Sequence, residues 1–152
     1  MHRQLPHLLG FAADNAFIGG GTDNRIYCNA AYGVIGGGLC NLIDEDAQHG
    51  FIGAGECNTV TNAALYSTIL NGDYNTINSN HSIVLGGSGN TIPAGMDFSV
   101  VFGNGITATA GDMLFASQLN ALNTQNGAGG LPPGTIFYST VPIPGAKQLY
   151  IV

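Results

Sequence analysis

Apolar and polar positions recur along the chain in a short, fixed cycle. In each of six successive units a small residue is followed two positions later by an aliphatic residue, and a polar slot and a second aliphatic slot lie six and eight positions further on. The first aliphatic column consists of Ile18, Ile35, Ile52, Ile69, Val84 and Val101, at spacings of 17, 17, 17, 15 and 17. The polar column consists of Asn24, Asn41, Asn58, Asn75 and Asn90, with Thr107 in the sixth slot. The closing aliphatic column consists of Ile26, Ile43, Val60, Ile77 and Ile92, with Thr109 in the sixth slot. A period this short predicts a solenoid, in which stacked coils bury a face that no single coil can bury alone.

The end of the repeat has two interpretations. Leu114 lies six residues before Asn120 and eight before Leu122, the internal offsets of the other units, which favours a seventh coil. The glycines are missing there and the gap after Val101 shrinks to 13, which favours an end after the sixth coil. We expect a roll of six or seven coils within residues 15–123.

Each unit predicts two short strands joined by two tight corners. The first strand surrounds the first aliphatic residue, as in residues 33–36, and the second is the Asn-x-aliphatic segment, as in residues 75–77. Glycine pairs such as Gly37-Gly38 supply the positive φ angles that tight corners need. The Asn side chains can stack as a ladder of amides through successive coils. The fold class that follows is all-β.

The first strand of each unit predicts self-association. Side chains alternate across a strand, and both faces of this strand are apolar, which is typical of a strand buried on both sides. The flanking pairs are Phe17/Gly19, Val34/Gly36, Phe51/Gly53, Thr68/Leu70, Ile83/Leu85 and Val100/Phe102. A coil with two strands has one interior, so the second face would form a large exposed apolar patch. We expect identical copies to cover this face, with Phe set against Gly as matched volumes along a shared seam.

Two segments carry a family resemblance. Residues 99–111 read SVVFGNGITATAG and residues 81–86 read HSIVLG, while the first units read Ile-Gly-Gly-Gly-x-x-Asn-x-Ile. Over about residues 15–111 this pattern resembles the heads of YadA-type trimeric adhesins and the related coils of viral and phage fibres. The resemblance implies a left-handed β-roll, three copies packed side by side with the first strand inward, and adhesion or fibre architecture without catalytic residues.

The resemblance leaves two locations open. A complete bacterial autotransporter of this kind continues into a coiled-coil stalk and an anchoring barrel, and the chain contains no heptad repeat. We therefore expect the virion surface, with the bacterial cell surface as the alternative.

The composition and charge of the chain limit the classes of partner that it is expected to bind. Only 8% of residues are charged, the formal net charge is −6, and the only basic residues are Arg3, Arg25 and Lys147. This balance favours neither nucleic acid nor an anionic membrane as partner. No apolar run approaches the 18 residues of a membrane span, and the start MHRQLPHLLGFAAD has no signal-peptide core.

The N-terminal segment, residues 1–14, lies outside the repeat and carries four large apolar residues: Leu5, Leu8, Leu9 and Phe11. It can cap the open edge of the first coil, or it can be a docking peptide that attaches the protein to a larger particle. The two roles are compatible.

The C-terminal segment, residues 124–152, contains two apolar runs at 135–139 and 148–152 that predict a β-hairpin. It either caps the last coil or forms a recognition tip. In a tip, Tyr138, Tyr150 and Phe137 are the residues expected to contact a host glycan or receptor, because aromatic rings stack on sugars.

The cysteines leave one pairing open. Three cysteines exclude a closed disulfide framework. Cys40 and Cys57 occupy the same slot in successive coils, about 5 Å apart at strand spacing, which permits a bridge. Free thiols at two small corner positions are the favoured interpretation.

No catalytic, cofactor-binding or metal-binding residues are predicted. Glu56 and Asp73 share a corner slot in adjacent coils, and paired carboxylates serve glycoside hydrolysis or cation binding, but exposed corner acids are the favoured interpretation. The acidic run 44–46 is interpreted as a solvated loop. The histidines His49 and His81 alternate with Tyr32, Tyr66 and Phe98 in one slot and are interpreted as rings that fill space rather than metal ligands.

One further pattern lies in the slot after Asn. Thr59, Thr76 and Thr91 are expected to form an outward row, similar to the threonine rows of ice-binding solenoids. Arg25 and Leu42 interrupt it at one end and Ala108 at the other, so the signal is weak.

The sequence therefore predicts a non-enzymatic structural virion protein: a short fibre, spike or capsid decoration. It is expected to form a homotrimer, to join a capsid or tail through residues 1–14 and to contact a host glycan. The first alternative is the head fragment of a bacterial trimeric adhesin, and the second is a carbohydrate-active enzyme built on a β-helix.

Overall fold

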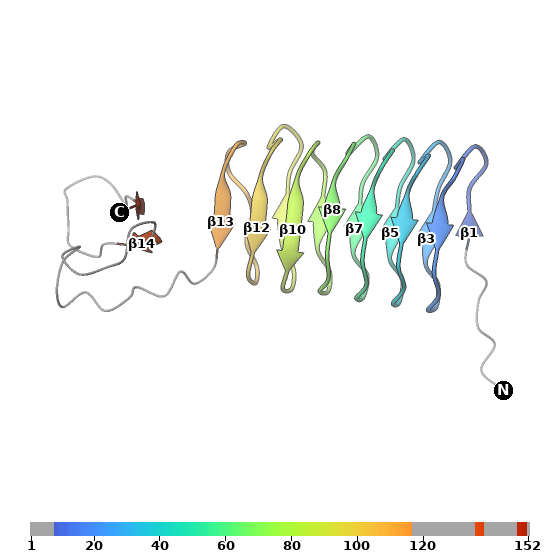
Figure 1. The fold of residues 1–152 in the computed structure, drawn as a ribbon, viewed down its shortest axis with the longest axis horizontal. Coiled ribbons are helices and arrows are strands. Elements are labelled where there is room, and N and C mark those ends of the chain that lie inside the picture. Colours follow the sequence, from blue (N-terminus) through green and yellow to red (C-terminus); the bar gives the residue numbers. More distant parts are fainter. Residues whose placement is uncertain (1–7, 117–135, 139–148, 152) are drawn as a thin grey trace. The chain divides into compact units, whose positions relative to one another are not determined.

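The computed structural model describes residues 8–116, 136–138 and 149–151, which belong to two units, residues 1–117 and residues 118–152. The first unit is a β-solenoid of parallel strands stacked in about six turns (Figure 1), as the repeat predicts. The described residues contain no helix, and so none that could cross a membrane. The all-β prediction is confirmed.

Two parallel sheets form the sides of the solenoid. The seven-stranded sheet consists of β2 (Phe17–Ile18), β4 (Val34–Ile35), β6 (Phe51–Ile52), β8 (Thr68–Ile69), β10 (Ile83–Gly86), β12 (Val100–Phe102) and β13 (Leu114–Ala116). The six-stranded sheet consists of β1 (Leu8–Leu9), β3 (Arg25–Ile26), β5 (Leu42–Ile43), β7 (Thr59–Val60), β9 (Thr76–Ile77) and β11 (Thr91–Ile92). Neighbouring strands come from successive coils, so residues at the same place in the repeat are stacked in register.

The core lies between the two sheets and consists of the predicted aliphatic columns. The fully buried aliphatic residues are Ile35, Ile52, Ile69, Val84 and Val101 from the seven-stranded sheet and Ile26, Ile43, Val60, Ile77 and Ile92 from the six-stranded sheet. The corners contribute small residues such as Ala30, Ala47 and Ala64. Because the inward side chains stack at the strand spacing, each coil buries its apolar residues mainly against those of the neighbouring coils.

The Asn column forms the predicted ladder at one corner of the coil. The Nδ2 atom of Asn41 donates to Oδ1 of Asn24 at 3.1 Å, and the next three links, up to Asn90, measure 3.1, 3.0 and 2.9 Å. Each Oδ1 also accepts the backbone N–H of the next Asn at 3.0–3.1 Å. All five Asn side chains are fully buried, and no buried side-chain N or O atom in the described residues lacks a hydrogen-bond partner. The ladder therefore satisfies polar groups that would otherwise be costly to bury.

The sixth coil differs from its predicted register by one residue. Ile106, not Thr107, occupies the Asn slot, because its backbone N–H donates to Oδ1 of Asn90 at 3.0 Å. Thr107 pairs with Thr91, and the buried Ala108 fills the closing aliphatic slot assigned to Thr109. The corner after Val101 is one residue shorter than in the earlier coils, which shifts every later position.

The seventh coil begins as a strand, again shifted by one residue. Phe115 pairs with Val101 and packs against the core, whereas the predicted column residue Leu114 pairs with Val100 and is half-exposed. Asn120 and Leu122 lie outside the described residues.

The two ends of the chain also carry strands. Leu8 and Leu9 pair with Arg25 and Ile26, so the solenoid already includes part of the segment assigned to residues 1–14. In the second unit, β14 (Ile136–Tyr138) and β15 (Leu149–Ile151) pair antiparallel, which confirms the predicted pairing of these two strands.

Candidate functional site

The outer face of the seven-stranded sheet is the largest candidate site on the solenoid. Its first outward column consists of Phe17, Val34, Phe51, Thr68, Ile83, Val100 and Leu114, stacked by the strand register. Beside it, the large residues Leu70, Leu85 and Phe102 are 47%, 42% and 58% exposed. We call this surface the apolar face. An isolated chain therefore presents a continuous apolar patch of the kind that marks an interaction site.

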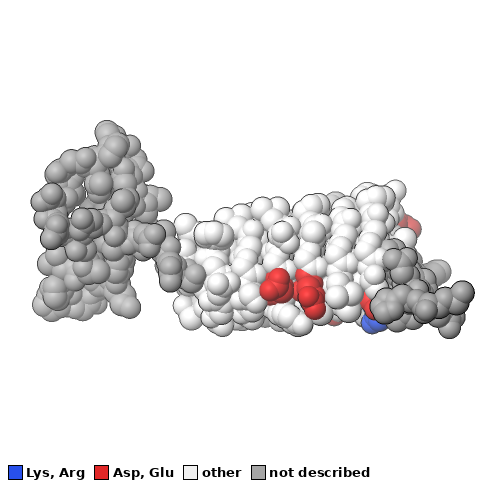
Figure 2. Space-filling view, turned by 90° about the horizontal axis from the view of Figure 1, so that it is seen from below, with Lys and Arg blue, Asp and Glu red and all other residues white. Residues whose placement is uncertain are grey.

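Charge is absent from the apolar face. None of the seven strands of this sheet contains a charged residue. All nine acidic residues of the chain lie within residues 8–116, and each of them lies in a corner or connection outside the strands of this sheet. Figure 2 shows one side of the solenoid on which acidic side chains gather in a small patch and most of the surface is uncharged.

The glycines that flank the first strands have a backbone role. A Cβ atom at Gly19 would meet the carbonyl oxygen of Gly36, and one at Gly36 would meet that of Gly53. The backbone at Gly19 and Gly36 therefore leaves no room for a side chain.

A stack of five rings runs along the corner that precedes the apolar face. The rings of Tyr32, His49, Tyr66, His81 and Phe98 have centroids 4.6–5.2 Å apart and interplanar angles of 7–18°. The faces of the inner rings are covered by their neighbours, so the column offers ring edges rather than faces to a ligand. The stacking agrees with the interpretation of His49 and His81 as rings that fill space.

The sequence reasoning missed the backbone of this ring column. All five residues have φ between 53° and 59°, the left-handed region that non-glycine residues rarely adopt. The only signal in the sequence was the alternation of His and aromatic residues in one slot.

The two corner acids lie next to each other as predicted. Glu56 and Asp73 are bridge partners in adjacent coils, and both are exposed. The hydroxyl of Tyr74 donates to Oε1 of Glu56 at 3.4 Å. Both side chains are exposed to solvent, as expected for acids at a corner.

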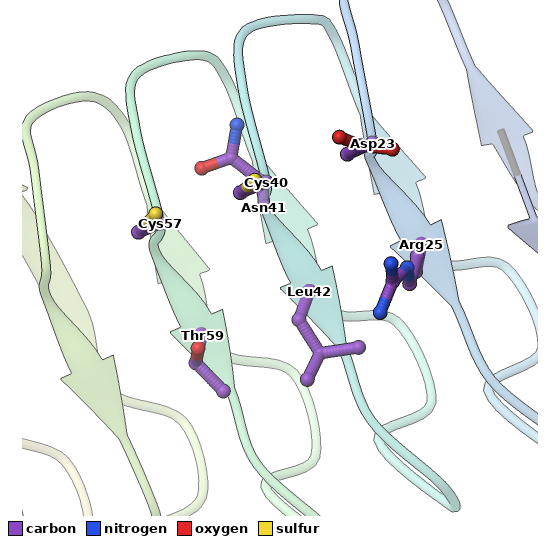
Figure 3. A pocket seen from close by; sticks show the side chains of 7 residues that line it. All are labelled: Asp23, Arg25, Cys40, Asn41, Leu42, Cys57 and Thr59. Carbon is purple, nitrogen blue, oxygen red and sulfur yellow. The ribbon is translucent and has the colours of Figure 1, made fainter. Parts of the chain in front are cut away.

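The residues that follow this acid column include two stacked thiols, and we call this place the thiol corner. Cys40 and Cys57 stack in one column with Asp23 before them and Tyr74 after them, all four at φ of 51–55°. The residues that line a shallow groove at this corner are Asp23, Arg25, Cys40, Asn41, Leu42, Cys57 and Thr59 (Figure 3). All three cysteines are free, in agreement with the favoured interpretation.

The surroundings of Cys57 disfavour its thiolate form. Burial raises the pKa of the Cys57 thiol, and Cys40 and Glu56 raise it further. Glu56 is also the main cause of the raised pKa of Tyr74, with Cys57 adding to it. The Cys57 side chain interacts directly with those of Cys40 and Tyr74, so the column is one interacting group.

The residues proposed for attachment and recognition lie at the two ends. Leu8 and Leu9 are half-exposed at the edge of the six-stranded sheet and Phe11 is 89% exposed, while Leu5 lies outside the described residues. Phe137 pairs with Tyr150, and Tyr138 pairs with Leu149. The hairpin thus brings two of the three proposed glycan-contact positions opposite each other.

No protein-family model, curated protein or solved structure matches the chain.

Proposed function

We propose that the chain is a non-enzymatic structural module that assembles as a homotrimer through the apolar face. In this role it serves as the spacer of a virion fibre, spike or capsid decoration. One observation carries the proposal: seven stacked strands present an outer face that is apolar except at Thr68, partly exposed in the single chain and free of charge. Water contact with such a face is costly, and burial against protein removes that cost.

Identical copies are the occupants that fit this face best. The outward rows repeat once per coil, so a second copy in the same orientation presents rows at the same spacing over the whole length. A partner of different design would have to reproduce that period. Closed symmetry then limits the assembly, and the count of three rests on the resemblance to trimeric adhesin heads.

A matched pair of substitutions in one coil tests the proposal. Thr68 on β8 and Thr76 on β9 are both partly buried strand residues that face outward, Thr68 between Phe51 and Ile83 and Thr76 between Thr59 and Thr91. Light scattering of the purified full chain should give three times the 15.6 kDa chain mass. Thr68→Asp should give the single-chain mass, because it buries an unpaired charge in the assembly, and Thr76→Asp should leave the trimer intact.

Two results would contradict this assignment. One is a wild-type protein with the mass of a single chain at micromolar concentration. The other is equal dissociation by both substitutions, which would remove the link between assembly and the apolar face.

The N-terminal and C-terminal segments are proposed to carry attachment and glycan recognition, respectively. The exposed Phe11 and the half-exposed Leu8 and Leu9 support attachment of the N-terminal end to a particle. The paired strands β14 and β15 support a compact element at the other end, with Tyr138, Tyr150 and Phe137 as glycan contacts. Deleting residues 124–152 should abolish retention on a glycan array, whereas Phe11→Ser should leave that retention unchanged and weaken joining to the particle.

A further inference from the structure

The thiol corner brings two cysteines together in a way that the proposed structural role does not use. Cys40 and Cys57 occupy equivalent positions on neighbouring coils, and their side chains interact. Figure 3 shows them in one row with Asp23, beside a second row formed by Arg25, Leu42 and Thr59. The corner lies where each coil enters the six-stranded sheet, so it is separate from the apolar face.

The spacing of the coils decides what can bridge the two sulfur atoms. Equivalent side chains one coil apart are 4.6–5.2 Å apart at the ring column, as expected for stacked strands. A disulfide needs Cβ atoms about 3.5–4.5 Å apart, closer than parallel side chains on adjacent coils stand. The Zn–S bond of about 2.3 Å sets the scale of metal–thiolate bonds, so one cation between two thiolates in line would span about 4.6 Å, close to the coil spacing.

We propose that Cys40 and Cys57 form a two-coordinate site for a soft, thiophilic cation, with Cu(I) as the biological ion of that class. Thiolates select Cu(I) among the common metals because both partners are soft. No group of three or more His, Cys, Asp or Glu side chains placed to hold a metal occurs in the described residues. The corner offers two free thiols as ligands rather than the closed four-ligand shell of a structural zinc site.

Charge around the corner suits the complex. Binding of Cu⁺ to two thiols releases two protons and leaves a dithiolate complex of net charge −1, with no change of oxidation state. Asp23 lines the groove and Glu56 precedes Cys57 in the chain, and both carboxylates favour the approach of a cation. Arg25 lines the same groove and can balance the negative complex.

Anaerobic titration with Cu(I), buffered by a chromophoric copper chelator, tests the site. The full-length chain should withdraw one Cu(I) per chain from the chelator. Its apparent affinity should rise with pH, because two thiols must lose protons, and its Tm should rise with bound ion. Cys40→Asn and Cys57→Asn should each abolish the withdrawal, and Cys28→Ser should retain it.

Asn is chosen for the two test positions because it tolerates the left-handed backbone found there. Circular dichroism and the Tm of each apo variant identify any that fails to fold, and Cys40→Ser and Cys57→Ser then take their place. Thr68→Asp separates this site from the assembly: the variant should bind one Cu(I) per chain whatever its mass.

Three outcomes would overturn the site. They are Cu(I) withdrawal that survives both Asn variants, withdrawal that is equally lost in Cys28→Ser, and a Cys40–Cys57 disulfide in the protein as isolated under air. The last would show that the sulfur atoms approach closer than the coil spacing allows in this structure.

Discussion

The two sheets of the solenoid share one backbone plan and one core but have opposite outer faces. Inside, Ile69 and Ile77 of the same coil are both fully buried. Outside, the seven-stranded sheet presents Phe, Val, Ile and Leu with one threonine, Thr68. The six-stranded sheet presents Leu8, Arg25, Leu42 and three threonines. Packing of the core therefore constrains the inner residues of both sheets alike, whereas it does not determine the outer residues.

This difference supports the proposed assembly through the apolar face. A strand that needs only to fold can be polar outside, as β7, β9 and β11 show with Thr59, Thr76 and Thr91. The chain keeps apolar residues on the other outer face, where they lower solubility and raise the risk of aggregation. That cost is offset only if the face is covered in the working assembly.

The largest expected effect comes from the Asn ladder, which lies at the corner between the two sheets. Asn58→Ala should lower the free energy of unfolding by about 4 kcal/mol, because it removes several hydrogen bonds of the buried ladder. The N–H of Asn75 loses its acceptor, and Nδ2 of Asn75 and Oδ1 of Asn41 each lose one of their partners. Urea unfolding followed by circular dichroism at fixed protein concentration measures it. Asn62→Ala, at an exposed corner, should change the value by less than about 0.5 kcal/mol.

The inner faces of the two sheets should respond alike. Ile69→Ala and Ile77→Ala each open a cavity in the same coil, and each should cost about 3 kcal/mol. The two losses in free energy of unfolding, measured by the same urea titration, should agree to within about 1 kcal/mol. A much larger cost on one side would show that the two sheets do not share the core equally.

The outer faces should respond differently, and a double-mutant cycle shows it. Leu70→Ala should cost about 2 kcal/mol in the assembled protein and about 1 kcal/mol or less in the Thr68→Asp background, where Leu70 stays half-exposed. Leu42→Ala, on the outer face of the six-stranded sheet, should cost the same in both backgrounds. Equal coupling of both leucines to Thr68 would argue against assembly through the apolar face.

The parts of this structure that follow from the period could be predicted from the sequence. The aliphatic columns and the Asn ladder depend on residues that recur at one offset, and in-register stacking converts an offset into a contact. The hairpin strands were also predictable, from two apolar runs separated by prolines and glycine. The sixth coil was not, because a corner one residue shorter moves Ile106 and Ala108 into slots that the pattern gave to Thr107 and Thr109.

The corners were predicted in part. Gly38 and Gly87 have positive φ as expected, but the ring column and the thiol column also place His, Tyr, Phe and Cys at positive φ, which was not expected. Each coil fixes the backbone of the next, so a strained conformation is held by hydrogen bonds to its neighbours rather than by its own residue type. The contacts of Cys57 with Cys40 and Tyr74 follow from that backbone and have no signal in the sequence beyond a shared slot.

The smallest expected effect lies at the thiol corner, next to the six-stranded sheet. Burial, Cys40 and Glu56 raise the pKa of Cys57, so its alkylation by iodoacetamide should rise at higher pH than that of an ordinary thiol. Glu56→Gln removes one of these causes, and should shift the profile of Cys57 slightly toward lower pH. Asp73→Asn, which neutralises the bridge partner of Glu56, should leave the profile in place. Peptide mass spectrometry after timed alkylation separates Cys57 from Cys28 and Cys40, and equal shifts in both variants would show that general surface charge, not the Glu56 contact, sets the profile.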